Sequence, residues 1–117
     1  MLNSREESIL NGLLHAVGER QELLANNLTN IRSKGYARKD IDFHFVLSSL
    51  ENADENQNPN FNSIIKKATF VEENKPMSLE KELAAMTENH LKYILLTRIN
   101  GHIYKHLEEA TQSGRAA

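Results

Sequence analysis

The chain has 117 residues, of which 39% are apolar and 26% charged, the length and composition of a single water-soluble domain. Fourteen basic and sixteen acidic residues give a formal net charge of -2, so the chain lacks the basic excess typical of proteins that bind nucleic acid. The absence of cysteine excludes disulfides and thiolate metal sites, and we expect neither a secretory signal nor a transmembrane segment, since no apolar run is long enough.

The first predicted element is a long helix from about Ser4 to about Arg32. Ser4 followed by Glu7 is the pattern of a capping box, and apolar residues then recur at helical spacing along one stripe. Gly12 and Gly18 each weaken this helix by about 1 kcal/mol relative to alanine, so we expect it to depend on a packing partner. The residues expected to face that partner within the chain are Leu13, Val17, Leu24, Leu28 and Ile31.

The middle of the chain is predicted to be extended or irregular. Residues 41–50 fit both the two-residue period of a strand and one face of a short helix, and both interpretations stay open. Residues 51–62 are polar, rich in asparagine and interrupted by Pro59, which is the composition of a flexible insert. The β-branched residues between Ile64 and Val71 favour a strand or an irregular extended arm.

A second long helix is predicted from Leu79 to about Gln112, with Ser78 as its N-cap. On a helical wheel it has two apolar stripes on nearly opposite sides. The stripe expected to pair with the first helix comprises Leu79, Leu83, Met86, Tyr93, Ile94 and Tyr104. The second stripe comprises Ala84, Leu91, Leu95, Ile99 and Ile103. This helix would be about 52 Å long, whereas a small domain is about 30 Å across, so we expect neighbouring subunits to cover the second stripe.

These elements divide the chain into three predicted segments. Residues 1–35 form the N-terminal helix, residues 36–77 the extended middle segment with its flexible polar insert, and residues 78–117 the C-terminal helix. A mainly α fold follows, because the two long helices hold most of the apolar residues that keep a regular spacing. Short β strands in the middle segment are compatible with this fold class.

The segment ANNLTNIRSKGY, residues 25–36, resembles the signature A-N-N-(I/L)-A-N-x-x-T-P-G-Y of bacterial flagellar rod and hook proteins. Thr29 replaces the usual alanine, and Ser33 and Lys34 replace the usual Thr-Pro, so we expect a softer turn than proline would enforce. Within that axial protein family, the following ARKDIDF and the C-terminal segment are similar to subunits of the proximal rod. The positions that match the signature are Ala25, Asn26, Asn27, Leu28, Asn30, Gly35 and Tyr36.

The resemblance implies a non-enzymatic subunit of the flagellar basal body. Proteins of this family polymerise helically into the rod, the drive shaft that crosses the periplasm and transmits torque from motor to hook and filament. They leave the cytoplasm through the flagellar type III export system without a cleaved signal peptide, and their terminal helices pair as an antiparallel coiled coil. The partners implied are copies of the chain, other flagellar rod proteins, and the adaptor, ring and export-gate proteins of the basal body.

The asparagines of the signature each lower helix propensity. Asn26 and Asn30 share a helical face away from the apolar stripe, and Asn27 borders the stripe. A neutral amide has two donors and an acceptor, so we expect these side chains to bond backbone groups of a neighbouring subunit. The alternative is that they are surface residues of a fraying helix end. Gly35 is expected to end the helix in the left-handed conformation, and Tyr36 to anchor the turn.

No catalytic residue, cofactor, metal or small-molecule substrate is predicted. His102, His106 and Glu109 share a helical face, but no second ligand cluster accompanies them, so a polar helix edge is the expected reading. Adjacent glutamates such as Glu6 and Glu7 diverge on a helix, and the chain has no phosphate loop or nucleophile motif. Two alternatives to a proximal-rod subunit stay open: another flagellar rod subunit, or a cytosolic helical binding module such as an export chaperone.

Overall fold

The computed structural model describes residues 3–54 and 58–116, with the side chains of 102–108 and 110–116 outside the description. In chain order the elements are α1 (Ser4–Thr29), β1 (Arg38–Ile41), α2 (Phe43–Glu51), α3 (Phe61–Ala68), β2 (Thr69–Glu72) and α4 (Leu79–Ala116). The fold is therefore mainly α, as predicted, with one small antiparallel sheet in the described part of the chain. Within that same part, no helix is both long and apolar enough to cross a membrane.

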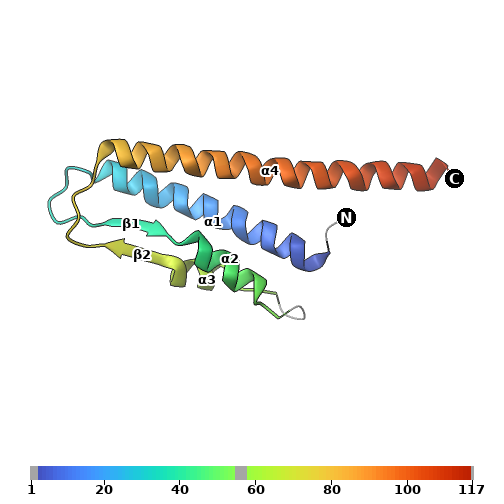
Figure 1. Ribbon diagram of the computed structural model, residues 1–117, viewed down its shortest axis with the longest axis horizontal. Coiled ribbons are helices and arrows are strands. Elements are labelled where there is room, and N and C mark those ends of the chain that lie inside the picture. The colour runs from blue at the N-terminus through green and yellow to red at the C-terminus, as the bar shows by residue number, and fades with distance from the viewer. Residues whose placement is uncertain (1–2, 55–57, 117) are drawn as a thin grey trace.

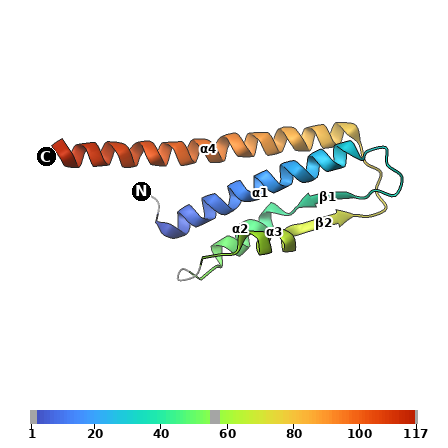
Figure 2. The ribbon, with the colours of Figure 1, turned by 180° about the vertical axis from the view of Figure 1, so that it is seen from behind.

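The molecule is flat and elongated, with α1 in its middle. Helix α4 runs along one side of α1 in the opposite direction, and the strands with α2 and α3 lie along the other side, as both views show (Figures 1 and 2). The radius of gyration is 17.8 Å, whereas a compact domain of this length has a radius of about 13 Å. The elongation comes from α4, whose C-terminal part extends beyond the start of α1 (Figure 1).

Both ends of α1 are capped by asparagine side chains. Asn3, one residue before the predicted Ser4, is the N-cap, because its Oδ1 accepts a hydrogen bond from the Glu6 N–H at 2.8 Å. The helix ends at Thr29, before the predicted boundary, because Asn30 takes the C-cap position. Gly35 has a φ of +83°, so the expected left-handed conformation is present, but it lies in the loop that follows the helix and does not end it.

The middle segment contains more helix than predicted. Strands β1 and β2 pair antiparallel, with Arg38 opposite Glu72, so short strands are present. Helix α2 decides between the strand and the short helix that both stayed open for residues 41–50, and α3 corrects the irregular or extended chain expected for its residues. Each of these helices has its own cap: Asp42 accepts from the Phe45 N–H and Asn60 from the Ser63 N–H, both at 3.1 Å. Within the predicted flexible insert, residues 55–57 lie outside the described residues.

The apolar core lies between α1 and the middle segment. Gly12 lets α1 and α2 approach closely, because a Cβ at this position would lie 2.7 Å from both terminal methyl groups of Leu50. Half-buried side chains from α1, α2 and α3 surround this core, Phe43 and Phe61 among them. Its buried members are Ala16, Ile41, Val46, Leu50, Ile65 and Ala68.

Helix α4 contacts α1 through a more polar face than predicted. Leu79, Leu83 and Tyr93 were expected to pair with α1, but they are 52%, 48% and 50% exposed. Among the described side chains of α4, the fully buried ones are instead Glu82 and Asn89, which lie two turns apart and have hydrogen-bond partners on α1. These hydrogen bonds determine which face of α4 packs against α1. Of the other residues predicted for this pairing, Val17 and Leu24 are buried, and Leu13, Leu28, Ile31, Met86 and Ile94 are half-buried. The Tyr104 side chain is outside the described residues.

Candidate assembly site

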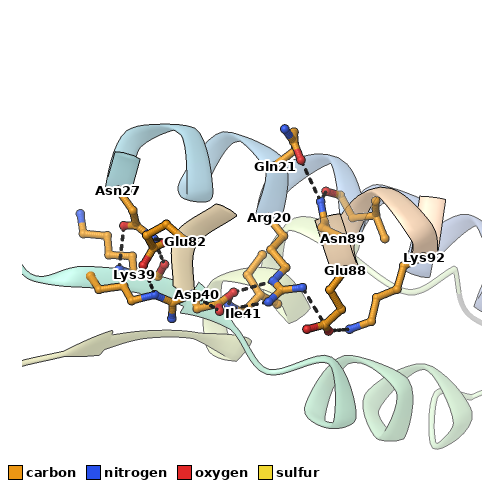
Figure 3. Close-up of polar contacts among 12 residues, drawn as sticks. Arg20, Gln21, Asn27, Lys39, Asp40, Ile41, Glu82, Glu88, Asn89 and Lys92 are labelled. Carbon is orange, nitrogen blue, oxygen red and sulfur yellow. Dashed lines mark hydrogen bonds and ion pairs between the residues drawn. The ribbon is translucent and has the colours of Figure 1, made fainter. Parts of the chain in front are cut away.

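Asn27 joins α1 to β1 by binding the strand's backbone. Its Nδ2 donates to the Lys39 carbonyl at 2.7 Å, and its Oδ1 accepts from the Lys39 N–H at 3.0 Å (Figure 3). The same Oδ1 accepts from the Tyr36 hydroxyl at 3.1 Å. The amide thus pairs with the N–H and C=O of Lys39 on the edge of β1 that faces away from β2, as the backbone of a neighbouring strand would. The expectation that Asn27 bonds another subunit is corrected, because its side chain is wholly buried and satisfied inside the chain.

The other two asparagines of the signature, Asn26 and Asn30, have different environments. Asn30 donates from Nδ2 to the Asn26 carbonyl at 2.9 Å and accepts from the Ser33 hydroxyl at 3.2 Å, so it secures the helix end. Asn26 is exposed. Asn26 therefore remains the member of the three that is open to a neighbouring molecule.

The remaining signature residues lie around this junction. Tyr36 and Leu28 are half-buried, and Ala25 and Gly35 are exposed. The structure joins Asn27 and Tyr36 directly and leaves Ala25 and Asn26 on the outer surface of α1. The signature thus has an inner half that holds the fold and an outer half that is free to contact something else.

A chain of ion pairs continues from this junction. Arg20 on α1 donates to both oxygens of Asp40, at 2.7 and 3.3 Å, and Arg38 donates to Asp40 at 2.8 Å and to Glu82 on α4. Asp40 is 6% exposed and Glu82 0%, so two carboxylates and two guanidinium groups offset one another in a nearly dry space. The cluster joins α1, β1 and α4 at one place, as Figure 3 shows for its labelled members.

Two members of this cluster, Asp40 and Arg38, have pKa values shifted toward their charged forms. Burial raises the pKa of Asp40, but hydrogen bonds from Arg20 and the Ile41 N–H outweigh it and hold that pKa below its ordinary value of 3.8. Burial lowers the pKa of Arg38, but Asp40 and Glu82 more than reverse this, so the pKa is raised. Asp40 and Arg38 therefore both favour their charged forms, as members of an electrostatic clamp formed with Arg20 and Glu82.

Polar contacts also set the position of α4 along α1. Asn89 donates from Nδ2 to the Val17 carbonyl at 3.1 Å and to Gln21 Oε1 at 3.2 Å (Figure 3). Glu88 pairs with Arg20 at 3.5 Å and with Lys92 at 2.9 Å, and the hydrogen bond from Lys92 lowers the pKa of Glu88. A slip of α4 by one turn would separate these partners, so the register is specified by polar groups.

The second apolar stripe of α4 is exposed. Leu91, Leu95 and Ile99, four residues apart, are 55%, 60% and 50% exposed, and Ala84 is exposed as well. The Ile103 side chain lies outside the described residues. These four residues are exposed in the single chain. What covers it in an assembly stays a prediction.

Local sequence patterns do not identify the four charged residues of the clamp, Arg20, Arg38, Asp40 and Glu82. Arg20 lies between Val17 and Leu24 at helical spacing, so a charge on the buried stripe was the available signal for a buried counter-charge. Among the described residues, no group of three or more His, Asp or Glu is placed to hold a metal ion. The His102 and His106 side chains lie outside those residues.

A comparison with models of known protein families found no match to this chain, and a search of curated proteins found none either. The features of the chain that bear on its function are therefore the clamp, the stripe and the motif in residues 25–36.

Proposed function

We propose that this chain is a structural subunit of the bacterial flagellar basal-body rod, similar to the proximal-rod protein FlgB, and that it polymerises helically into the drive shaft. The observation that carries the proposal is the uncovered apolar stripe of Leu91, Leu95 and Ile99 on a helix that extends past the rest of the fold. A stripe of this kind needs a partner surface, and the chain itself does not supply one for these three residues.

The size of the stripe favours repeated contacts over a single tight one. Complete burial of one large aliphatic side chain contributes about 1.5–3 kcal/mol, and these three already lie about half-buried, so covering them contributes roughly 2–4 kcal/mol. Association of two molecules costs an estimated 4–15 kcal/mol in lost freedom. One such contact is too weak to hold a pair together, whereas a lattice that gives every subunit several contacts offsets this cost.

The clamp supports the mechanical part of the proposal. A shaft transmits torque only if each subunit moves as one body. Arg20, Arg38, Asp40 and Glu82 tie α1, β1 and α4 together, so a force on α4 reaches the rest of the fold through directional bonds. In the assembled rod, α1 and α4 would form the antiparallel coiled coil of the inner wall.

The proposal also names partners and location. The subunit would leave through the flagellar type III export system without a cleaved signal peptide and join the rod in the periplasm. There it would contact copies of itself, other rod proteins, the basal-body adaptor, and the ring and export-gate proteins. The exposed Ala25 and Asn26 are the signature residues available for such contacts.

The test compares the same charge on two sides of α4. Leu95→Asp places a carboxylate in the stripe, and His90→Asp places one on another face of the helix, where the side chain is also exposed. We expect both proteins to fold, Leu95→Asp to lose polymerisation and swimming, and His90→Asp to keep both. The measurements are sedimentation of polymers, electron microscopy and motility. Polymers and swimming of Leu95→Asp at the wild-type level would refute the proposal.

A second candidate uses the same stripe. A cytosolic binding module, such as an export chaperone, would hold a partner helix against Leu91, Leu95 and Ile99. Cell fractionation separates the two functions, because a rod subunit leaves the cytoplasm with the basal body and a chaperone stays behind. A chain found only in the cytoplasm of swimming cells would favour the chaperone.

A further inference from the structure

Helix α4 contributes no residue to the apolar core. The core residues come from α1, β1, α2 and α3, which together with β2 form the body of the molecule. Among the described side chains of α4, the buried ones are the polar Glu82 and Asn89, and Asn89 Oδ1 has no hydrogen-bond partner. A buried polar atom without a partner costs free energy, and the desolvation of a buried ion pair offsets much of its attraction. We therefore expect the docking of α4 to add less to stability than the core does.

The ion pairs of the clamp allow α4 to leave without stranding a charge in the body. Arg20 and Arg38 both bind Asp40, at 2.7 and 2.8 Å, and all three residues belong to α1 or β1. Arg38 also lies 3.6 Å from Glu72 of β2. Departure of α4 would remove the Glu82 carboxylate but leave each arginine with a carboxylate partner. The body therefore keeps its charges paired, which avoids the main penalty of breaking a buried ion pair.

The other ionic contacts of α4 are partly exposed. Lys92 Nζ lies 4.1 Å from the centre of the Phe43 ring, and Glu88 pairs with Arg20 at 3.5 Å. The side chains of Lys92 and Glu88 are 36% and 57% exposed. Ionic contacts at such exposed positions contribute little, because water replaces them readily when one partner moves away.

A single exposed loop connects α4 to the body. Residues 73–78 run from the end of β2 to the start of α4 (Figure 1). Glu73, Asn74, Lys75 and Pro76 in this loop are exposed, and Asn74 has a φ of +61°, a left-handed conformation that costs free energy for any residue other than glycine. An exposed loop can change its backbone angles without loss of buried contacts, as a hinge requires.

Helix α4 covers a row of apolar side chains on α1. Leu10, Val17 and Leu24, which we call the covered row, are spaced seven residues apart and so share one side of the helix. They are 7%, 3% and 0% exposed, yet they are not members of the core. On this side the Val17 carbonyl accepts a hydrogen bond from Asn89 of α4. The covered row is therefore buried by α4, and the body alone would expose it.

We infer that α4 is a releasable strap, and that its release from a body that stays folded is the lowest-energy opening of the molecule. Proteins open in cooperative units of different free energy, and a unit with few buried apolar contacts opens first. The closed form remains the stable one. Release uncovers Leu10, Val17 and Leu24, so any contact made through the covered row is possible only in the released form. The strap thus controls access to one side of α1.

Two buried valines test the inference by thiol labelling, since the chain has no cysteine of its own. Val17→Cys places a thiol in the covered row, and Val46→Cys places one in the core, where the original side chains are 3% and 1% exposed. Cysteine behaves as a small buried apolar residue, so both sites accept it. At a concentration where the chain is monomeric, we expect Val17→Cys to be labelled at least about tenfold faster than Val46→Cys. Equal rates, or faster labelling of Val46→Cys, would overturn the inference.

Hydrogen exchange provides a second test that needs no cysteine. In wild type, the amides of α4 from Glu82 to Lys92 should exchange faster than those of α1 from Gly12 to Leu24. Val46→Ala removes two buried carbon atoms from the core, so it should speed exchange of the α1 amides about tenfold. It should leave the α4 rates unchanged, because the core is present in both the closed and the released forms. Equal exchange of the two helices in wild type, or equal acceleration of both by Val46→Ala, would show that α4 and the core open together. Either result would leave the exposed stripe of α4, and the function proposed from it, untouched.

Discussion

Asn27 stabilises the fold through four polar contacts made by a single side chain. It binds both backbone groups of Lys39, accepts from Tyr36 and lies 3.4 Å from a Glu82 oxygen. Asn27 lowers the helix propensity of α1, but its contacts connect α1 to the next strand and to the first turn of α4. At this helix end Asn27 makes contacts within the fold, and the exposed Asn26 is available for contacts with another subunit.

Truncation of this side chain should be costly. Asn27→Ala removes the hydrogen-bond partner of both Lys39 backbone groups at a part-buried site, and we expect a loss of about 1–3 kcal/mol in the free energy of unfolding. Asn26→Ala, one residue away and exposed, should change it by less than about 0.5 kcal/mol. Urea unfolding followed by circular dichroism measures both. Equal effects for the two variants would show that the Asn27 contacts add nothing to stability.

The clamp predicts a loss of stability in acid. The pKa of Asp40 is lower in the folded protein than its ordinary value of 3.8, so folding favours the ionised carboxylate. This contribution is complete above about pH 5, begins to fall as the unfolded chain takes up protons near pH 4, and is lost as the pH drops through the folded value. Unfolding free energies measured between pH 7 and pH 2.5 should show the decline.

Asp40→Asn supplies the control for that profile. The amide cannot ionise, so this variant should be less stable at neutral pH, where Arg20 and Arg38 lose their shared counter-charge. Its stability should also depend less on pH below about 5. An acid profile parallel to that of wild type would mean that other carboxylates cause the decline.

The clamp marks the limit of what the sequence predicts at this scale. A glycine with positive φ at Gly35 follows from local chemistry, because few other residues adopt that conformation. The partners of Arg20 do not, since Asp40 lies 20 residues away and Glu88 lies 68. Helical spacing indicates that Arg20 faces inward, but only the packing of three elements determines which carboxylates meet it.

At the scale of elements, α1 depends on small residues where the middle segment crosses it. Gly12 lies against Leu50 and Phe61, and Ala16 belongs to the same buried core. Gly18 has no atom within 4 Å of its missing Cβ. Two glycines with the same propensity cost in the sequence therefore have different roles in the fold.

Alanine at each glycine should shift stability in opposite directions. Gly18→Ala should raise the free energy of unfolding by about 0.5–1 kcal/mol through helix propensity alone. At Gly12 the new methyl group would lie 2.7 Å from the Leu50 methyl groups and 3.1 Å from Phe61, and Leu50 is buried. The strain of overpacking, about 1–3 kcal/mol, should exceed the gain in propensity. Thermal and urea unfolding of the two variants, compared with wild type, decide the point. Stabilisation by both substitutions would mean that α2 moves away at little cost.

The elements themselves were predictable to different degrees. The two long helices follow from apolar spacing sustained over many turns, and α4 begins at the predicted residue. Helix α3 was missed because its eight residues begin in an asparagine-rich segment with a loop composition. Its cap, Asn60, is one of several asparagines there, and nothing local distinguishes it from the others. The polar face that α4 turns toward α1 does not follow from the spacing of its apolar residues, because Glu82 and Asn89 are held there by partners on α1.

For the whole molecule, both the shape and the burial indicate a small core. The principal extents are 66, 29 and 16 Å, so the protein is a thin layer with few residues far from solvent. The core binds α1 to the middle segment, while polar contacts fix α4 in register and leave its outer side exposed. The stability of the monomer therefore depends on the clamp and on a small apolar core. Neighbours in a polymer would add the apolar burial that the monomer lacks.

Stability should therefore depend on concentration through the stripe. The Tm from calorimetry should rise with protein concentration, because association binds only the folded state. Adding Leu95→Asp should remove that dependence. It should leave the Tm at high dilution nearly unchanged, since Leu95 is 60% exposed and substitutions at such positions usually change stability by less than about 0.5 kcal/mol. A Tm that falls at high dilution as well would place Leu95 in the fold of the monomer, and the stripe would then be part of the core instead of a contact between subunits.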